Sequence, residues 1–402
     1  MLRTCCDRIP FLLNALLAGL LVCATALAPA AHAAPPVPAG TPVIVDTDCG
    51  TDDLLALAFL LARSDVHIEA ITVVNGMAHV PTGAANVLAL LQLAGRTDIP
   101  VYAGSSVPLS GHAAFPAAWR KISDELPGVD LPKSQAKQQG ESAVSFLVRR
   151  LSDSKRPARI LALGPLTNIG AALRQESYGA QAIEELVIMG GAVRVPGNLG
   201  DGGVFKTENK TAEWNFYIDP LAASIVFTSK AAIRLIPLDA TQQVPIHADF
   251  VKSLQGGAKG TLEQFAAQVL ASDDTAIREG YFYAWDPLAA VALVDVDVVR
   301  VTPMAIQITM TGNDQGRSVE TQGSAPNARV ALTADAATFR REFVAALAAA
   351  LAPKPQSPTA PPAAKAPPAA PSQAKPRAAA PPAKPPAAAT PAAPASPANG
   401  RP

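Results

Sequence analysis

Four aspartates lie within eight positions of the segment VIVDTDCGTDD, which spans residues 43–53: Asp46, Asp48, Asp52 and Asp53. Carboxylates at this spacing repel one another, and their pKa values rise unless a cation lies among them. Ligands that are all oxygen atoms select a hard cation, and a flexible site with many ligands suits calcium better than magnesium. The segment therefore predicts a calcium site.

Helix structure alone can explain the presence of only two of these four aspartates. Thr51 is the expected N-cap of a helix over 52–63, which places Asp52 and Asp53 in its first turn. The helix dipole favours acids there without any ligand. It does not account for Asp46 and Asp48, which directly follow the apolar run VIV.

Apolar runs and helical patterns alternate along the middle of the chain. Such alternation indicates parallel strands joined by crossover helices. We therefore expect an α/β fold with an open, mostly parallel sheet and helices on both faces. The expected strands are 43–46, 68–74, 100–104, 159–164, 185–191 and 233–239. The expected helices are 52–63, 82–95, 141–152, 166–175 and 219–228.

The acidic segment lies where such a sheet would bind a ligand. Open α/β sheets bind their ligands beyond the carboxyl ends of the strands. The residues at such ends are Asp46, Asp48, Leu163, Gly190 and Asp239. This placement favours a binding site, independently of any family.

The first 33 residues have the pattern of a secretory signal. A weakly basic start precedes an apolar run, and the segment ends in Ala31-His32-Ala33. A membrane anchor is the alternative, but the run is short. We expect a periplasmic or secreted protein without a membrane span after cleavage. Cys49 is then the one cysteine of the mature chain, so no internal disulfide can form.

The last part of the chain, residues 352–402, is rich in Pro, Ala and Lys. Its final 50 residues contain 17 prolines and no acid, so we expect a disordered basic tether. A solvated tail and a cell-envelope contact both remain open. The predicted single catalytic domain, 34–351, has 25 basic and 32 acidic residues, a net charge of −7. A nucleic-acid-binding domain would be basic, so that partner is not expected.

Three further stretches complete a pattern. They are LALGPLTNIG (161–170), IMGGAVRVPGN (188–198) followed by TAEWNFYIDP (211–220), and YFYAWDPLAAVALV (281–294). With DTDCGTDD they resemble the nucleoside hydrolases, enzymes that cleave the N-glycosidic bond of ribonucleosides. The resemblance implies their Rossmann-like fold, and a homo-oligomer is possible.

The resemblance, which runs from about Pro42 to Leu351, implies roles for single residues. The implied calcium ligands are Asp48, Asp53, Asp286 and the backbone carbonyl of Leu163. The implied ribose contacts are Asp52 and Asn215 at the 2′- and 3′-hydroxyls, and Asn198 and Glu213 at the 5′-hydroxyl. Asp48 is also the implied general base for a calcium-bound water, and Asp46 supports the cluster.

The tryptophans resemble those of the purine-preferring, inosine-adenosine-guanosine branch. We expect Trp119 and Trp285 to flank the base and Trp214 to form a wall of the sugar pocket. Indole faces attract a purine that is made cationic by protonation at N7. None of the chain's histidines matches a leaving-group acid. The expected substrate is therefore a purine nucleoside, cleaved to free base and ribose.

Two departures from the family pattern leave questions open. Cys49 replaces the usual Pro, either for packing or as a redox liability. Met77 stands at the usual Asn position of the loop 73–81, where Asn75 or His79 could substitute.

Two other functions compete. One is a periplasmic nucleoside-binding protein without catalysis. The other is a haloacid-dehalogenase-like phosphatase, which also opens with Asp-x-Asp but usually has Thr or Val at the position of Gly50.

Overall fold

The computed structural model describes residues 42–350, apart from 112, 154, 156, 177–178 and 258–259. Within these residues, none of the helices has the length and apolar character that a membrane span requires. The predicted signal, 1–33, and the tail, 352–402, lie outside the described residues, so export stays a prediction.

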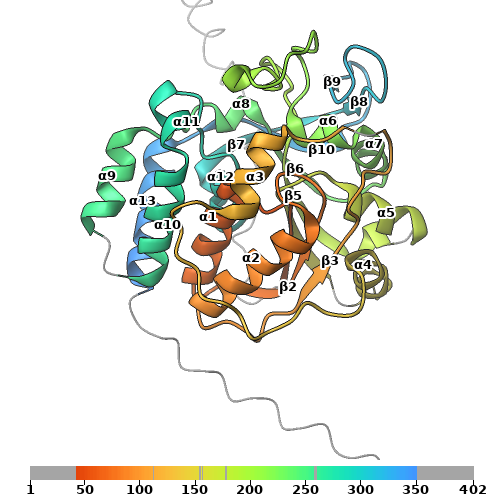
Figure 1. The fold of residues 1–402 in the computed structure, drawn as a ribbon. Coiled ribbons are helices and arrows are strands. Elements are labelled where there is room, and N and C mark those ends of the chain that lie inside the picture. The colour runs from red at the N-terminus through yellow and green to blue at the C-terminus, as the bar shows by residue number, and fades with distance from the viewer. Residues whose placement is uncertain are drawn as a thin grey trace, which may run out of the picture. The chain divides into compact units, whose positions relative to one another are not determined.

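An eight-stranded sheet forms the centre of the described fold (Figure 1). Its order is β3-β2-β1-β4-β5-β6-β10-β7, and only the β10–β7 pair is antiparallel. The six expected strands are all present, which confirms the predicted fold class. They are β1 (Pro42–Thr47), β2 (His67–Val73), β3 (Val101–Ala103), β4 (Ala158–Ala162), β5 (Ile183–Met189) and β6 (Ile233–Ile236). The strands that the sequence analysis did not predict are β7 (Val299–Met304), β8 (Ile306–Ile308), β9 (Ser318–Glu320) and β10 (Ala328–Ala334).

Helices cover both faces of the sheet because both faces are apolar. Val43 and Val45 of β1 pack in one hydrophobic core, while Ile44 between them packs in the other. The first core is formed with α1 (Thr51–Ala62), α2 (Val80–Leu93), α9 (Ala248–Gly257), α10 (Thr261–Ser272), α12 (Trp285–Val294) and α13 (Ala336–Ala349). The second is formed with α4 (Ala143–Leu151), α5 (Thr167–Gln175) and α7 (Pro220–Thr228).

The remaining helices of the described chain are α-helices and single turns of 3-10 helix. They are α3 (Ala117–Glu125), α6 (Trp214–Ile218), α8 (Leu238–Thr241), α11 (Asp274–Glu279), η1 (Gly179–Ala182), η2 (Asp201–Gly203) and η3 (Val296–Val298).

The strand order reverses direction between β1 and β4. In doubly wound sheets the loops that leave such neighbouring strands diverge and open a crevice for ligands. Here the loop after β1 is the acidic segment, and Leu163 follows β4 directly. The topology therefore brings together residues that lie more than a hundred positions apart in the sequence.

A buried ion cluster joins neighbouring strands to α12. Glu185 of β5 accepts hydrogen bonds from Arg159 of β4 at 2.8 Å and from Arg234 of β6 at 2.5 Å. The same two arginines donate to the carbonyls of Leu293 and Ala292, each at 2.6 Å. Those carbonyls belong to the last turn of α12, so the cluster anchors the far end of the helix that begins at Trp285.

We expect Glu185→Gln to lower the free energy of unfolding at neutral pH by about 3–5 kcal/mol. The substitution leaves buried guanidinium charges without their partner. Burial alone would raise the pKa of Glu185, but Arg234 and Arg159 outweigh it and hold the pKa below its usual value. A lowered pKa stabilises the fold above the unfolded-state pKa, and this stabilisation is lost as the pH falls through the folded-state pKa.

Urea unfolding at pH 7 and at progressively lower pH measures this effect. The deficit of the variant should shrink as the pH falls through the folded-state pKa of Glu185. Glu184→Gln removes an exposed carboxylate one residue earlier and should unfold like the unmodified protein. Equal unfolding midpoints for Glu185→Gln and the unmodified protein at pH 7 would contradict the prediction.

Candidate active site

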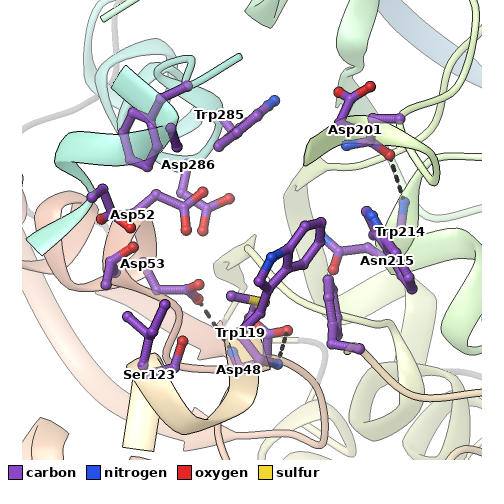
Figure 2. A pocket seen from close by; sticks show the side chains of 18 of the residues that line it. Asp48, Asp52, Asp53, Trp119, Ser123, Asp201, Trp214, Asn215, Trp285 and Asp286 are labelled. Atoms are coloured by element: carbon purple, nitrogen blue, oxygen red, sulfur yellow. Dashed lines mark hydrogen bonds between the residues drawn. The ribbon is translucent and has the colours of Figure 1, made fainter. Parts of the chain in front are cut away.

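A cavity of about 390 Å³ lies at the carboxyl edge of the sheet (Figure 2). Its volume is in the range of small-molecule sites. The loops after β1, β4 and β5 reach it, together with α3, α6, α11 and α12. Among the described residues, no lysine, arginine or histidine lines it. Seven carboxylates do: Asp48, Asp52, Asp53, Asp201, Glu213, Asp273 and Asp286.

The acidic segment turns sharply between β1 and α1. Helix α1 starts at Thr51 with Gly50 as its N-cap, so the prediction that Thr51 is the cap was wrong by one residue. The reason is that the Gly50 N–H donates to the Asp53 carboxylate at 2.9 Å, which closes the turn without a hydroxyl cap. Asp52 and Asp53 do lie in the first turn, as expected.

The backbone conformation at position 49 explains why this residue is not the proline of the family pattern. Its φ is 60°, which proline cannot adopt because its ring fixes φ near about −65°. The thiol is fully buried, and burial followed by the charge of Asp53 raises its pKa. The geometry therefore favours the packing interpretation of Cys49.

Asp48 is held rigidly at the centre of the segment. Its Oδ2 accepts a hydrogen bond from the Met77 N–H at 2.9 Å. A Cβ at Gly76 would lie 1.8 Å from the same oxygen, and one at Gly164 would lie 2.7 Å from the Asp48 Cβ. Only glycine fits at both positions, so two backbone segments enclose the carboxylate.

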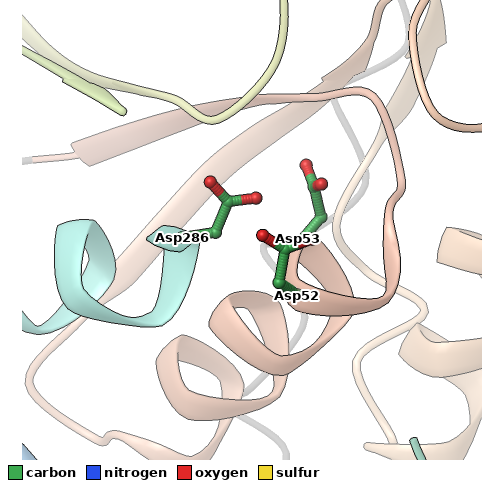
Figure 3. A group of neighbouring side chains, drawn as sticks. All are labelled: Asp52, Asp53 and Asp286. Atoms are coloured by element: carbon green, nitrogen blue, oxygen red, sulfur yellow. The ribbon is translucent and has the colours of Figure 1, made fainter. Parts of the chain in front are cut away.

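Asp52, Asp53 and Asp286 form a compact group of carboxylates (Figure 3). Each offers an oxygen, and these oxygens lie within 4.8 Å of one another. Asp286 stands in the first turn of α12, and its buried Oδ1 has no hydrogen-bond partner in the part of the chain that the structure describes. Burial, followed by the charges of Asp53 and Asp52, raises the pKa of Asp286.

This group fits a hard cation. All donors are oxygen atoms, one of them is orphaned, and a cation would relieve the repulsion. Burial and then Asp53 also raise the pKa of Asp48, so its carboxylate shares the same electrostatic environment. Leu163, whose carbonyl is the predicted main-chain ligand, lines the cavity, and this carbonyl accepts a hydrogen bond from Asn215 Nδ2 at 2.8 Å.

Asp46 lies behind this group and does not line the cavity. It accepts hydrogen bonds from the Thr72 hydroxyl at 2.5 Å and from Asn168 Nδ2 at 2.9 Å. Burial raises its pKa to about 7, although both hydrogen bonds lower it. Asp46 therefore ties β1 to β2 and α5.

Three further polar side chains, those of Asn198, Glu213 and Asn215, line the cavity. Glu213 caps α6 and accepts the N–H groups of Asn215 at 2.9 Å and of Gly191 at 2.8 Å. Asn198 Oδ1 accepts the Trp214 N–H at 3.1 Å. Burial raises the pKa of Glu213 to about 7, and the backbone donors act against it. These bonds fix the side chains in place before any ligand arrives.

The sequence places this cavity in a known family. Residues 43–341 match the family model described as inosine-uridine preferring nucleoside hydrolase. The chain belongs to that family. The chemistry of this nucleoside hydrolase is therefore cleavage of the N-glycosidic bond of nucleosides, which excludes the phosphatase alternative.

Individual relatives of this nucleoside hydrolase differ in their substrates. The chain is 33% identical over 285 residues to uridine nucleosidase 1 of Arabidopsis thaliana, covering 68% of this chain and 82% of that protein. A plant nucleoside hydrolase is a structural neighbour with a TM-score of 0.68 and 29% identity, covering 77% and 99% of the two chains. A purine-preferring ribonucleoside hydrolase from Gardnerella vaginalis has a TM-score of 0.68, 28% identity and the same coverage.

All eleven predicted site residues of this nucleoside hydrolase line the same cavity. The tryptophans reach it from separate elements, as Figure 2 shows. Trp214 is buried and stacks on Phe115, with ring centroids 4.9 Å apart. Trp119 makes an edge contact with Trp214 at 5.6 Å, whereas Trp285 packs against Phe282 at 5.3 Å. The two half-buried indoles, Trp119 and Trp285, thus have different neighbours.

The loop 73–81 contributes backbone to the site. Met77 reaches the cavity and donates its N–H to Asp48. His79 is turned away, because its ring pairs with Asp124 at 2.6 Å and its side chain is 58% exposed. Asn75 is buried and does not line the cavity. Neither of the substitutes considered for Met77 therefore lies in the cavity wall.

Other functional candidates were absent from the sequence prediction. They are Phe115, Asp201, Asp273, Tyr281 and Phe282, all of which line the cavity. None of them follows a predicted strand, so the strand-end argument could not find them. Asp239, in contrast, follows a predicted strand and yet does not belong to the site. It follows β6, as expected, but its carboxylate accepts the N–H groups of Val193 and Arg194, each at 2.8 Å, and does not line the cavity.

Proposed function

We propose that this enzyme hydrolyses purine ribonucleosides to free base and ribose with the aid of calcium. The observation that supports the purine assignment is the pair of half-buried indoles, Trp119 and Trp285, in a cavity that no described basic residue lines. Stacking between aromatic faces favours two fused rings over one. An indole face also attracts a purine that is protonated at N7.

The residues that line the cavity can be assigned separate roles in binding the ribose and the calcium ion. Asp52 and Asn215 would hold the ribose 2′- and 3′-hydroxyls, and Glu213 with Asn198 the 5′-hydroxyl. These contacts fix the anomeric carbon relative to Asp48. Asp48, Asp53, Asp286 and the Leu163 carbonyl would hold calcium. When bound, calcium would supply a Lewis acid that acidifies the attacking water and orients the ribose diol.

Asp48 would act as the general base. It takes a proton from the attacking water as the oxygen bonds to the anomeric carbon. The electron pair of the C1′–N9 bond leaves with the base. The surrounding carboxylates would stabilise the positive charge that develops on the sugar, because the charged side chains that line the cavity, among the described residues, are all acidic.

The same charge pattern favours nucleosides over nucleotides. A phosphate would enter a cavity lined by seven carboxylates and, among the described residues, no cationic side chain. Like charges in a partly desolvated site repel strongly. Unphosphorylated substrates are therefore the ones that this cavity accepts.

Initial rates on inosine, adenosine, guanosine, uridine and cytidine, with and without a calcium chelator, test the proposal. Purine nucleosides should exceed uridine in kcat/KM by about 10²-fold. The chelator should abolish turnover, and added calcium should restore it. Uridine cleaved as fast as inosine would overturn the purine assignment, in line with the uridine nucleosidase relative. Full activity in the chelator would overturn the metal assignment.

A further inference from the structure

Asp273 is a cavity-lining carboxylate that the proposed mechanism leaves without a role. It lies at the junction of α10 and α11, beside Ser272 and close to Thr275 and Ala276 in the cavity wall. Its Oδ2 is buried and has no hydrogen-bond partner among the described residues. A buried carboxylate oxygen without a partner is costly. Because Asp273 lines the cavity, a ligand bound there is the candidate partner for this oxygen.

The fold itself offers no sufficient reason for this carboxylate. Asp273 precedes α11, yet its side chain makes no capping hydrogen bond. It is not a member of the compact group formed by Asp52, Asp53 and Asp286. The Thr51 hydroxyl is a hydrogen-bond partner of the carboxyl group, but the second oxygen remains unpaired.

Two neighbours of Asp273 relate it to Asp52, the candidate contact for the ribose 2′-hydroxyl. Thr51 directly precedes Asp52, the candidate for the ribose 2′-hydroxyl. After burial and Asp53, the charge of Asp273 is the next cause of the raised pKa of Asp52, so the two carboxylates are close. The ribose 2′-carbon is bonded to the anomeric carbon that carries the base. A ribose held by Asp52 would therefore bring its anomeric carbon, and the base that it carries, toward this part of the cavity.

We propose that Asp273 hydrogen-bonds the leaving nucleobase and accepts the N–H that a purine carries once it is protonated at N7. This inference rests on the proposed function. An ionised carboxylate offers only acceptors, so it pairs with an N–H of the base. Hydrogen bonds between two charged groups are the strong ones. The contact would thus form mainly in the transition state, where it contributes to rate.

The step balances without a further reactant. The proton at N7 comes from solvent, and the C1′–N9 electron pair neutralises the purine as it leaves. The attacking water forms the new C1′–O bond and passes its proton to Asp48. Burial raises the pKa of Asp273 to about 6, so its carboxylate remains mostly ionised at neutral pH. Asp273 gives up no proton and only stabilises the cationic base between the indoles.

Kinetics of Asp273→Asn on two substrates test this role. On inosine, kcat/KM should fall about 10- to 100-fold, the range for losing a hydrogen bond to a charged group. On p-nitrophenyl riboside, whose leaving group needs no proton, it should stay within about threefold of the unmodified enzyme. Asp274→Asn is the matched control. Its side chain is 63% exposed, pairs with Arg278 and lies outside the cavity, so both rates should be unchanged.

These measurements test the role of Asp273 and the proposed function separately. Unchanged inosine kinetics in Asp273→Asn, or equal losses on both substrates, would overturn the role of Asp273. Failure of the unmodified enzyme to cleave inosine would instead overturn the proposed function. Asp273→Ser serves as the second variant if the asparagine protein does not fold. A melting temperature equal to that of the unmodified protein establishes that the compared proteins are folded.

Discussion

Asp48→Asn is expected to lower kcat at least about 10³-fold, because it removes the general base and weakens a calcium ligand together. Asparagine has nearly the shape of aspartate, so it fits between Gly76 and Gly164 and can still accept the Met77 N–H. The loss should therefore appear in turnover and not in folding. Steady-state rates on inosine and a thermal melt measure the two separately.

Calcium binding distinguishes the two contributions. If Asp48 acts mainly as the base, the substitution should change the calcium Kd, measured by calorimetry, far less than it changes kcat. Asp98→Asn is the control, since that exposed carboxylate pairs with Arg96 on the surface and should keep full activity. A folded Asp48→Asn protein with near-normal turnover would remove Asp48 from the catalytic machinery.

The sequence could predict the acidic site because the relevant residues obey a topological rule. Parallel strands bring their carboxyl ends to one edge, whatever the sequence distance between them. Asp48 after β1 and Leu163 after β4 therefore meet in one cavity, although more than a hundred residues separate them. Buried parallel strands also read as continuous apolar runs, which is why β1 to β6 were predicted correctly.

Other parts of the structure correspond to no recognisable pattern in the sequence. β7 is an edge strand with four consecutive exposed residues, so no buried run marks it. Asp273 reaches the cavity from the junction of two helices, and Met77 contributes its backbone N–H, which no residue type predicts. The one-residue error at Thr51 has a similar cause. There a side chain three positions ahead, Asp53, satisfies the Gly50 N–H in place of a hydroxyl cap.

The choice between purine and pyrimidine depends on Trp285. Its indole lines the cavity from the first turn of α12, next to Asp286, and its N–H has no partner among the described residues. Stacking contributes about 0.5–1.5 kcal/mol beyond area burial. A desolvated cation–π contact adds about 2 kcal/mol. The second term exists only for a protonated purine, since uracil has no N7.

Trp285→Ala should therefore lower kcat/KM on inosine at least about 10²-fold, because each 1.36 kcal/mol is about a factor of ten. The loss on p-nitrophenyl riboside should be much smaller, since that leaving group departs without a proton. The kcat/KM of Trp285→Phe on inosine should lie between those of the unmodified enzyme and of Trp285→Ala. Phenylalanine keeps an aromatic ring but attracts cations less than indole does. Equal losses on both substrates would mean that Trp285 only shapes the cavity. Unaltered inosine turnover in Trp285→Ala would remove this indole from the base site and, with it, the argument for purine preference.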